Sequence, residues 1–229
     1  MPDLIQDIHF ELTRKRVKYM RVRVCPPDGL ITVSAPLWVP LADIRKFVLE
    51  KADWIEKHQA KVRARPKPKQ LRYRDGEIHH FYGKAYALRL YEAQRKERVV
   101  RFGDELEMYI KPGATRQRRE QLLDAFYRKQ LLDAIPDLIA KYEPRMNVEV
   151  REFNVRKMRT RWGSCNIKAK RIWLSLELAK KPRECLEYVV VHEMVHLLEA
   201  SHNARFWRLV ERFMPDWEEK KQRLNARVD

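Results

Sequence analysis

The feature that most restricts how this chain can fold is a His-Glu-x-x-His motif, formed by His192, Glu193 and His196. On a helix, residues four positions apart lie on the same face, so both imidazoles can reach one metal ion. The glutamate can then reach a water molecule beside the ion rather than the ion itself. The apolar segment 188–191 before the motif predicts a buried helix, in which unpaired polar groups are costly. We therefore expect a buried helix that carries a metal site.

A hydrolytic zinc site needs a third protein ligand and an open position. His202 lies six residues beyond the motif, just past the expected helix end, where a turn can bring its ring back to the ion. Glu199 stands where metzincins carry a glycine, so the turn need not match theirs. Glu211 is the alternative, as a downstream carboxylate ligand. The expected Zn²⁺ ligands are His192, His196 and His202.

Apolar and polar residues alternate over short runs in the first 110 residues, a pattern typical of strands with one buried face. These runs cover residues 8–12, 17–24, 30–34, 77–82, 86–91, 98–102 and 106–110. Residues 41–60 change to helical spacing. The segment Arg65–Lys69 alternates basic residues with proline, which prevents a helix and predicts an extended boundary.

The second half is expected to be richer in helices. The expected segments are a helix at about 115–142, strands at 148–150, 155–162 and 171–177, a helix at 182–199, and a helix capped by Ser201 or Asn203. Pro136 should kink or restart the long helix. The fold class is therefore α+β. A β-rich N-terminal region of residues 1–110, with one helix at 41–60, precedes a region 111–229 built from an antiparallel hairpin and the metal-carrying helix.

The chain has a formal net charge of +17 at pH 7, from 49 basic and 32 acidic residues. A surface with this excess attracts polyanions, so nucleic acid is a candidate partner. Three widely spaced cysteines, Cys25, Cys165 and Cys185, favour free thiols in a reducing compartment. No apolar run is long enough for a membrane span, and no secretory signal is evident. We therefore expect a cytoplasmic protein.

Several motifs together resemble one protein family. They are Thr160-Arg161-Trp162-Gly163-Ser164-Cys165-Asn166, the segment Val189–His196, His202, the pair Phe206-Trp207, and Met214-Pro215-Asp216. With the basic strand at 17–24 and the helix around Trp54, they resemble the YgjP-like family of zinc metallopeptidases, which is distantly similar to SprT-like proteases. The resemblance covers about residues 10–227, so the whole chain is also consistent with one YgjP-like domain.

The resemblance implies a zincin-like α+β fold and a zinc-dependent hydrolase that cleaves amide bonds in a protein or peptide through a metal-activated water. It implies zinc held by His192, His196 and His202, with Glu193 as general base and acid. A second donor to the developing oxyanion is expected, and the candidates are Tyr188, Arg159 and Arg161. An extended substrate could add to the edge of the hairpin expected at 159–177.

Other functions remain open at the level of sequence. One is a nucleic-acid-associated binding protein in which zinc is structural or catalysis is vestigial. Another is a protease that acts on DNA-bound proteins, since basic residues could gather beside the site. A third is a hydrolase of non-peptide amides. Cys165 is not expected to be a nucleophile or a fourth ligand, because a thiolate there would close the open position.

Overall fold

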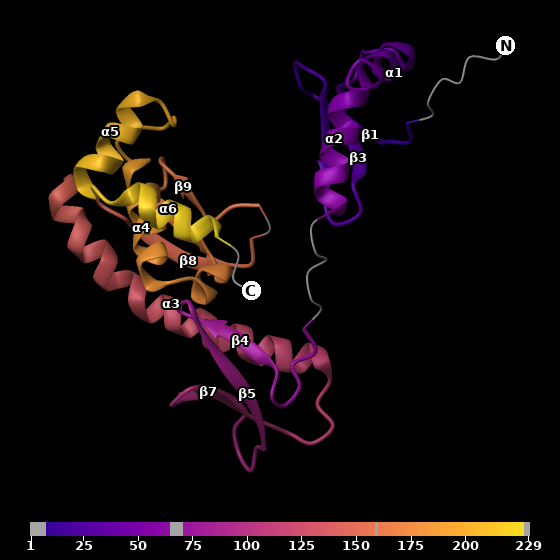
Figure 1. Cartoon of the computed structure of the whole chain (residues 1–229). Coiled ribbons are helices and arrows are strands. Elements are labelled where there is room, and N and C mark those ends of the chain that lie inside the picture. The colour runs from indigo at the N-terminus through magenta and orange to yellow at the C-terminus, as the bar shows by residue number, and fades with distance from the viewer. Residues whose placement is uncertain (1–7, 65–70, 159, 227–229) are drawn as a thin grey trace. The chain divides into compact units, whose positions relative to one another are not determined.

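The computed structural model describes residues 8–64, 71–158 and 160–226. Contacts between residues divide the chain into two compact units, with the division between Gln70 and Leu71. Figure 1 labels many of the elements of both units. The segment Arg65–Lys69, which we expected to form a boundary, lies outside the described residues.

The first unit is a small sheet with two helices. Its elements are β1 (Glu11–Lys15), β2 (Arg21–Cys25), β3 (Leu30–Pro36), α1 (Leu41–Leu49) and α2 (Ala52–Arg63). β3 lies between the other strands, parallel to β1 and antiparallel to β2. Because side chains alternate along a strand, β3 buries Ile31, Val33 and Ala35 on one face.

Two helices occupy the region where the sequence pattern predicts one helix over 41–60. α1 ends before Glu50 and the chain turns at Lys51, whose backbone N–H donates to the carbonyl of Val48. The turn lets Ile44 of α1 and Ile55 of α2 join the same small core. The single-helix prediction is therefore wrong in detail, because burial of both apolar faces requires a change of direction.

The second unit begins with a four-stranded sheet. Its strands are β4 (Ile78–Phe81), β5 (Lys84–Glu92), β6 (Arg98–Phe102) and β7 (Glu105–Ile110), in the order β4-β5-β7-β6. β5 and β7 are parallel and the other pairs are antiparallel. Leu88, Leu106 and Met108 are fully buried on the face that packs into the core of this unit.

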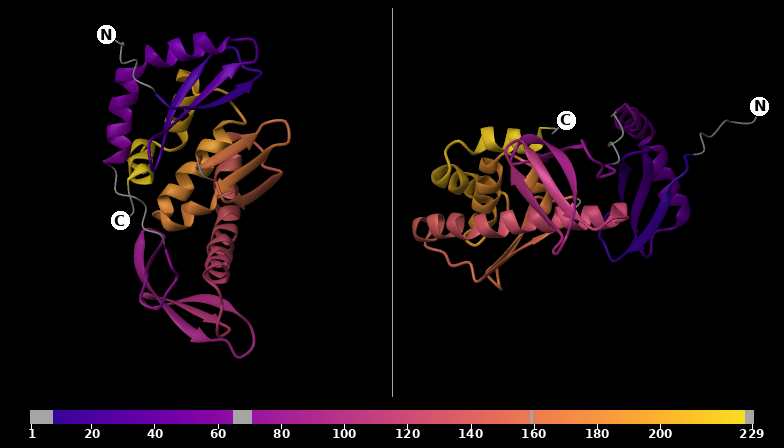
Figure 2. Two further views of the ribbon diagram at one scale, coloured as in Figure 1. Left: turned by 90° about the vertical axis from the view of Figure 1, so that its right-hand side faces the viewer. Right: turned by 90° about the horizontal axis from the view of Figure 1, so that it is seen from below.

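The long helix α3 (Arg116–Met146) connects this sheet to the rest of the unit. The Thr115 hydroxyl caps its first turn by accepting a hydrogen bond from the backbone N–H of Arg118 at 3.2 Å. The helix is continuous through Pro136, where we expected a kink or a restart. In the colours of Figure 2, α3 passes from the β4–β7 sheet to the C-terminal part of the chain. It contacts β6 and β7 of the sheet and two C-terminal helices, Arg183–Val195 and Ala204–Phe213.

The contacts of α3 explain why the units divide earlier than the boundary at 110/111 that the sequence pattern favours. The ring of Phe81 on β4 lies 5.1 Å from that of Phe126 on α3, measured between centroids. The Tyr127 hydroxyl donates to the carbonyl of His80 at 2.8 Å. The strands of residues 78–110 therefore share a core with α3 and belong to the second unit.

The last part of the unit supports the metal-carrying helix. Its elements are β8 (Glu152–Arg156), β9 (Gly163–Asn166), β10 (Arg171–Ser175), the 3₁₀ helix η1 (Leu176–Lys180), α4 (Arg183–Val195), α5 (Ala204–Phe213) and α6 (Trp217–Asn225). β10 lies between the other two strands, parallel to β8 and antiparallel to β9. The α+β class predicted from the sequence is confirmed.

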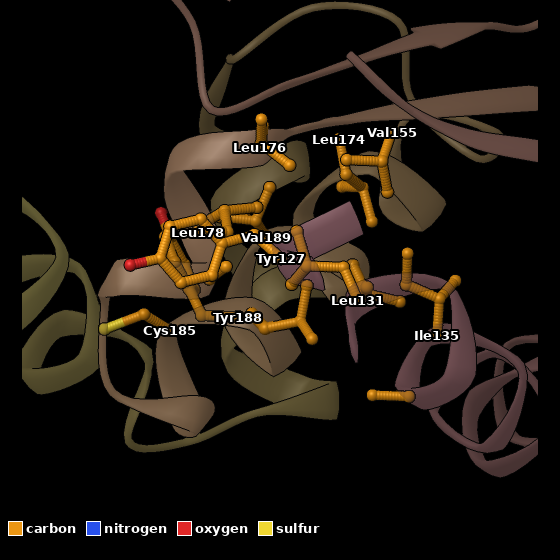
Figure 3. Close-up of a cluster of buried hydrophobic side chains, with 14 of the residues drawn as sticks. Tyr127, Leu131, Ile135, Val155, Leu174, Leu176, Leu178, Cys185, Tyr188 and Val189 are labelled. Carbon is orange, nitrogen blue, oxygen red and sulfur yellow. The ribbon is translucent and has the colours of Figure 1, made fainter. Parts of the chain in front are cut away.

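The core between α3 and α4 fixes α4 in place. Figure 3 shows Leu131 and Ile135 of α3 on one side, with Leu174, Leu178 and Val189 close by. All five side chains are buried.

Among the described residues, no helix combines the length and apolar character that crossing a bilayer requires.

Candidate metal centre

The helix α4 is buried on most of its surface, as the apolar residues before the motif predict. Val190, Val191, Met194 and Val195 have essentially no exposed surface. These side chains hold α4 against the rest of the unit, so the positions of His192 and Glu193 follow from core packing. The helix ends at Val195 rather than at Glu199 as expected, and His196 is its C-cap residue.

The early end of α4 brings the third histidine back toward the first two. The chain leaves α4 at His196 and enters α5 at Ala204, and Asn203 caps α5 by accepting a hydrogen bond from the backbone N–H of Phe206 at 3.0 Å. Asn203 was one of the two predicted caps, and this prediction is confirmed. The tight connection places His202 beside α4.

The three histidines point toward a common centre. One ring nitrogen from each lies within 4.8 Å of one from each of the others. Nε2 of His192 and Nε2 of His202 are 2.9 Å apart. A tetrahedral ion with bonds of 2.0–2.1 Å needs ligand nitrogens about 3.3 Å from one another. The cluster therefore has the dimensions of a three-histidine metal site after small movements of the rings.

The surroundings of the rings suit metal ligands. Nδ1 of His196 lies 3.1 Å from the carbonyl oxygen of Glu199, which holds that nitrogen as the N–H donor and leaves Nε2 for an ion. Burial, followed by the charges of the two other histidines, lowers the pKa of His192 to about 3. Burial also lowers the pKa of His196. Both imidazoles are therefore neutral at pH 7, the form that binds a metal.

Without an ion, three imidazoles this close together cannot all satisfy their ring nitrogens with hydrogen bonds. At most one proton can lie between the 2.9 Å pair, and the buried Nδ1 of His192 has no hydrogen-bond partner among the described residues. An ion at the centre would replace the contact between two nitrogens with bonds to both of them. The residues present therefore fit a divalent metal, and three nitrogen ligands are typical of catalytic zinc.

Glu193 lies beside the cluster, and its side chain is almost fully buried, with 5% of its surface exposed. Burial raises the pKa of its carboxyl group to about 8, and the charge of Arg161 opposes the rise. Burial favours the protonated form, which can donate a proton, and a cation bound beside the carboxyl group would favour the carboxylate, which can accept one.

Gly163, the first residue of β9, makes room for this carboxyl group. A Cβ atom at position 163 would lie 2.5 Å from Oε1 of Glu193 and 2.8 Å from its Cγ, closer than real Cβ atoms approach. The sequence places Gly163 in a recognisable motif but gives no sign of this contact, because it joins a strand to a helix distant in the chain.

Replacing Gly163 with alanine is expected to lower peptide cleavage by about a hundredfold, because the methyl group must push the Glu193 carboxylate out of position. Metal content should stay at the parent level, since no histidine is touched. Ser164→Ala, one residue along the same strand and also in the lining of the site, adds no atom, so it shows the effect of a change on β9 without the clash against Glu193. Cleavage by Gly163→Ala at the parent rate, measured with metal content, would show that the contact does not position Glu193.

A cavity of about 560 Å³ opens beside the histidines. Tyr188 and Arg161, two of the predicted oxyanion donors, line it, whereas Arg159, the third, lies outside the described residues. Burial raises the pKa of Tyr188 to about 12, so its hydroxyl keeps its proton and can donate a hydrogen bond. Cys165 also lines the cavity, and burial raises the pKa of its thiol to about 11, so it is protonated at pH 7.

Lys221 of α6 lines the same cavity and was missed by the sequence analysis. Its ammonium nitrogen lies 4.4 Å from the ring centroid of Trp207 and 5.0 Å from that of Trp217, and these two rings stack at 4.6 Å. The ring of Trp207 is 5.9 Å from that of His202. Nothing in the sequence tells where α6 packs, so this neighbour could not be identified.

Glu211, the alternative third ligand, is on α5 with its side chain exposed, and it is not part of the group of residues that could share an ion. His202 occupies that place instead. Of the two sequence alternatives, the described geometry therefore favours His202.

Comparison with known proteins shows which family this chain matches. A family model described as YgjP-like, metallopeptidase domain, matches residues 18–227. No curated protein matches the chain.

Two solved structures show partial likeness. The metallopeptidase zymogen of Pyrococcus abyssi abylysin is 22% identical over 39% of this chain and 90% of its own, with a TM-score of 0.36. The metallopeptidase zymogen of Methanocaldococcus jannaschii jannalysin is 20% identical over 38% of this chain and 90% of its own, with a TM-score of 0.34. Both likenesses cover less than half of this chain.

Proposed function

The chain belongs to the YgjP-like family and is a metal-dependent peptidase, and from this premise we propose that it is a zinc peptidase in which Glu193 is the general base and acid. The observation that carries the proposal is the convergence of His192, His196 and His202 on one centre, with a buried carboxyl group beside it. The proposed substrate is an amide bond in a protein or peptide.

The proposed mechanism assigns a separate role to each group. When bound, zinc supplies Lewis acidity toward a water molecule and toward the carbonyl oxygen of the scissile bond. The carboxylate of Glu193 accepts a proton as that water attacks the carbonyl carbon. The same carboxyl group then gives the proton to the departing amine. Its confinement against Gly163 keeps the carboxyl group aimed at the reacting atoms.

Tyr188 is the proposed second donor to the oxyanion. Its hydroxyl is protonated, since burial raises its pKa to about 12, and its ring lies 5.9 Å from that of His192, edge to face. A preformed donor in a cavity that excludes water stabilises developing charge more than an exposed donor does. Arg161 lines the same cavity but is exposed, so it is the weaker candidate.

The proposed path of the substrate follows β9. This strand is at the edge of its sheet, because β10 is its only partner among the described strands. An extended peptide can pair with such an edge through main-chain hydrogen bonds. Gly163 at the start of β9 touches Glu193, so a peptide on this edge would pass close to the carboxyl group.

Removal of metal tests the zinc assignment. Dialysis of the protein against a chelator is expected to abolish peptide cleavage, and added Zn²⁺ should restore it at one ion per chain. Elemental analysis gives the stoichiometry, and a fluorogenic peptide library gives the activity. Cleavage that persists in metal-free protein would contradict the proposal. Restoration by another divalent metal, but not by Zn²⁺, would replace zinc by that metal.

A further inference from the structure

A second hollow, of about 800 Å³, lies between the strand β6 and the helix α3. We call it the β6 groove. Residues 96–101 form one wall, and one face of α3 forms the other, at positions 122, 125, 126, 129 and 130. None of its lining residues lines the cavity of the metal centre.

The β6 groove follows the backbone of a strand. Four consecutive residues of β6, from Arg98 to Arg101, line it, together with Lys96 and Glu97 just before the strand. Successive side chains of a strand point to opposite faces, so a hollow lined by all four runs along the strand edge itself. β6 is the last strand in the order β4-β5-β7-β6, and β7 is its only partner among the described strands. Such an edge offers unpaired N–H and C=O groups to an added strand.

The floor of the β6 groove is apolar. Phe81, Leu122 and Phe126 line it and are each less than 10% exposed. Their side chains are packed into the core of the unit, so little of their surface is exposed to the hollow. Flat stacking of nucleic-acid bases needs exposed ring faces, which these residues do not offer.

The rim of the β6 groove carries excess positive charge. Lys96, Arg98, Arg101 and Arg183 are exposed, and none has a carboxylate partner among the described residues. The only acidic residue in the lining is Glu97, whose charge is already compensated by a salt bridge of 2.5 Å to Arg118. That salt bridge and the N–H of Lys111 lower the pKa of Glu97, so it remains a bound carboxylate.

Charges on an edge strand also protect proteins from aggregation. Protection alone does not require an apolar floor enclosed between the strand and a helix. Here backbone pairing groups, an apolar floor and cations without a carboxylate partner among the described residues occur together, although Arg98 also lies 4.5 Å from the ring centroid of Tyr109. This combination matches an extended segment with alternating apolar and acidic side chains. We propose that the β6 groove binds an acidic, extended protein segment as an added strand along β6.

The proposal is independent of the chemistry at the metal centre, because it concerns binding and not cleavage. Five residues of β6 span about 17 Å at about 3.3 Å per residue, so a peptide of about six residues fills the edge. The probe is a labelled, blocked peptide of about that length that alternates glutamate and valine. Fluorescence anisotropy with the full chain measures its binding.

Charge reversal at the rim tests the proposed site. Arg98→Glu together with Arg101→Glu is expected to weaken peptide binding by at least about tenfold. Arg45→Glu together with Lys57→Glu makes the same change in net charge at exposed helix positions of the first unit and should leave binding near the parent value. Lys96→Glu with Arg183→Glu is a second rim variant, in case the first disturbs β6.

The contribution of main-chain hydrogen bonds to peptide binding is tested with a second peptide. A peptide with alternate N-methylated amides cannot pair fully with the strand edge, so its affinity should fall by at least about tenfold. Equal loss in the rim and the control variants would overturn the proposal, because general charge attraction would then explain binding. Undiminished binding of the N-methylated peptide would overturn the added strand. Preferential binding of a single-stranded oligonucleotide of equal charge at this rim would also overturn it.

Discussion

Replacement of Glu193 with glutamine is expected to lower peptide cleavage by about 100- to 10,000-fold while the protein keeps its metal. Glutamine has nearly the same shape as glutamate, so it fits the same space against Gly163 and leaves the packing of α4 intact. It cannot accept a proton from water, and the general base is therefore lost. Cleavage of a peptide library, measured beside metal content and thermal unfolding, tests this expectation.

The matched control is Glu218→Gln, which makes the same chemical change at an exposed position on α6. It should cleave at the parent rate. A Glu193→Gln protein that cleaves as fast as the parent would remove Glu193 from the mechanism, although the three histidines would remain a metal site. Comparison of the peptides released by the parent and by Glu193→Gln would also identify the bonds that the enzyme selects.

Local signals in the sequence predict the helix of the metal centre well. The motif and the apolar residues before it both depend on a repeat of about 3.6 residues, which a single segment reveals without knowledge of its neighbours. The cap at Asn203 is similarly local, since its side chain bonds the backbone only three residues away. The metal-carrying helix and the cap at Asn203 mark the two ends of the short connection that contains His202. The sequence therefore indicates where His202 lies.

Contacts between distant segments could not be predicted in the same way. Gly163 meets Glu193, and Lys221 reaches the cavity, through the packing of β9 and α6 near α4. The expected linker at Arg65–Lys69 lies next to the division after Gln70, but the expected domain boundary at 110/111 differs from that division for a related reason. The run of strands at 78–110 resembles the strands before it in pattern, and only its packing on α3 assigns it to the second unit.

Two expectations from composition stay predictions. The net charge of +17 favours polyanions, but attraction to a charged surface does not specify nucleic acid. Cytoplasmic location also stays a prediction. Binding to DNA that weakens steeply with salt would support the first, and fractionation of cells that make the protein would test the second.

Replacement of His202 with alanine is expected to weaken zinc binding by more than about a hundredfold, because the ion keeps only two ligands from this chain. Cleavage should be lost with the metal. His202 is exposed and lies outside the buried part of α4, so the free energy of unfolding of the metal-free protein should change little. Competition with a zinc-binding dye gives the affinity, and thermal unfolding without metal checks the fold.

Glu211→Ala distinguishes between the two residues, His202 and Glu211, that the sequence allows as the third metal ligand. Zinc stabilises the folded chain in proportion to the logarithm of its concentration relative to its Kd, so the parent should unfold at a higher temperature when Zn²⁺ is added. Glu211→Ala should keep this rise, whereas His202→Ala should lose it. The opposite pattern would assign the third ligand to the carboxylate and would require α5 to turn Glu211 from solvent toward the histidines. Asn203, which fixes the start of α5 directly after His202, opposes that movement.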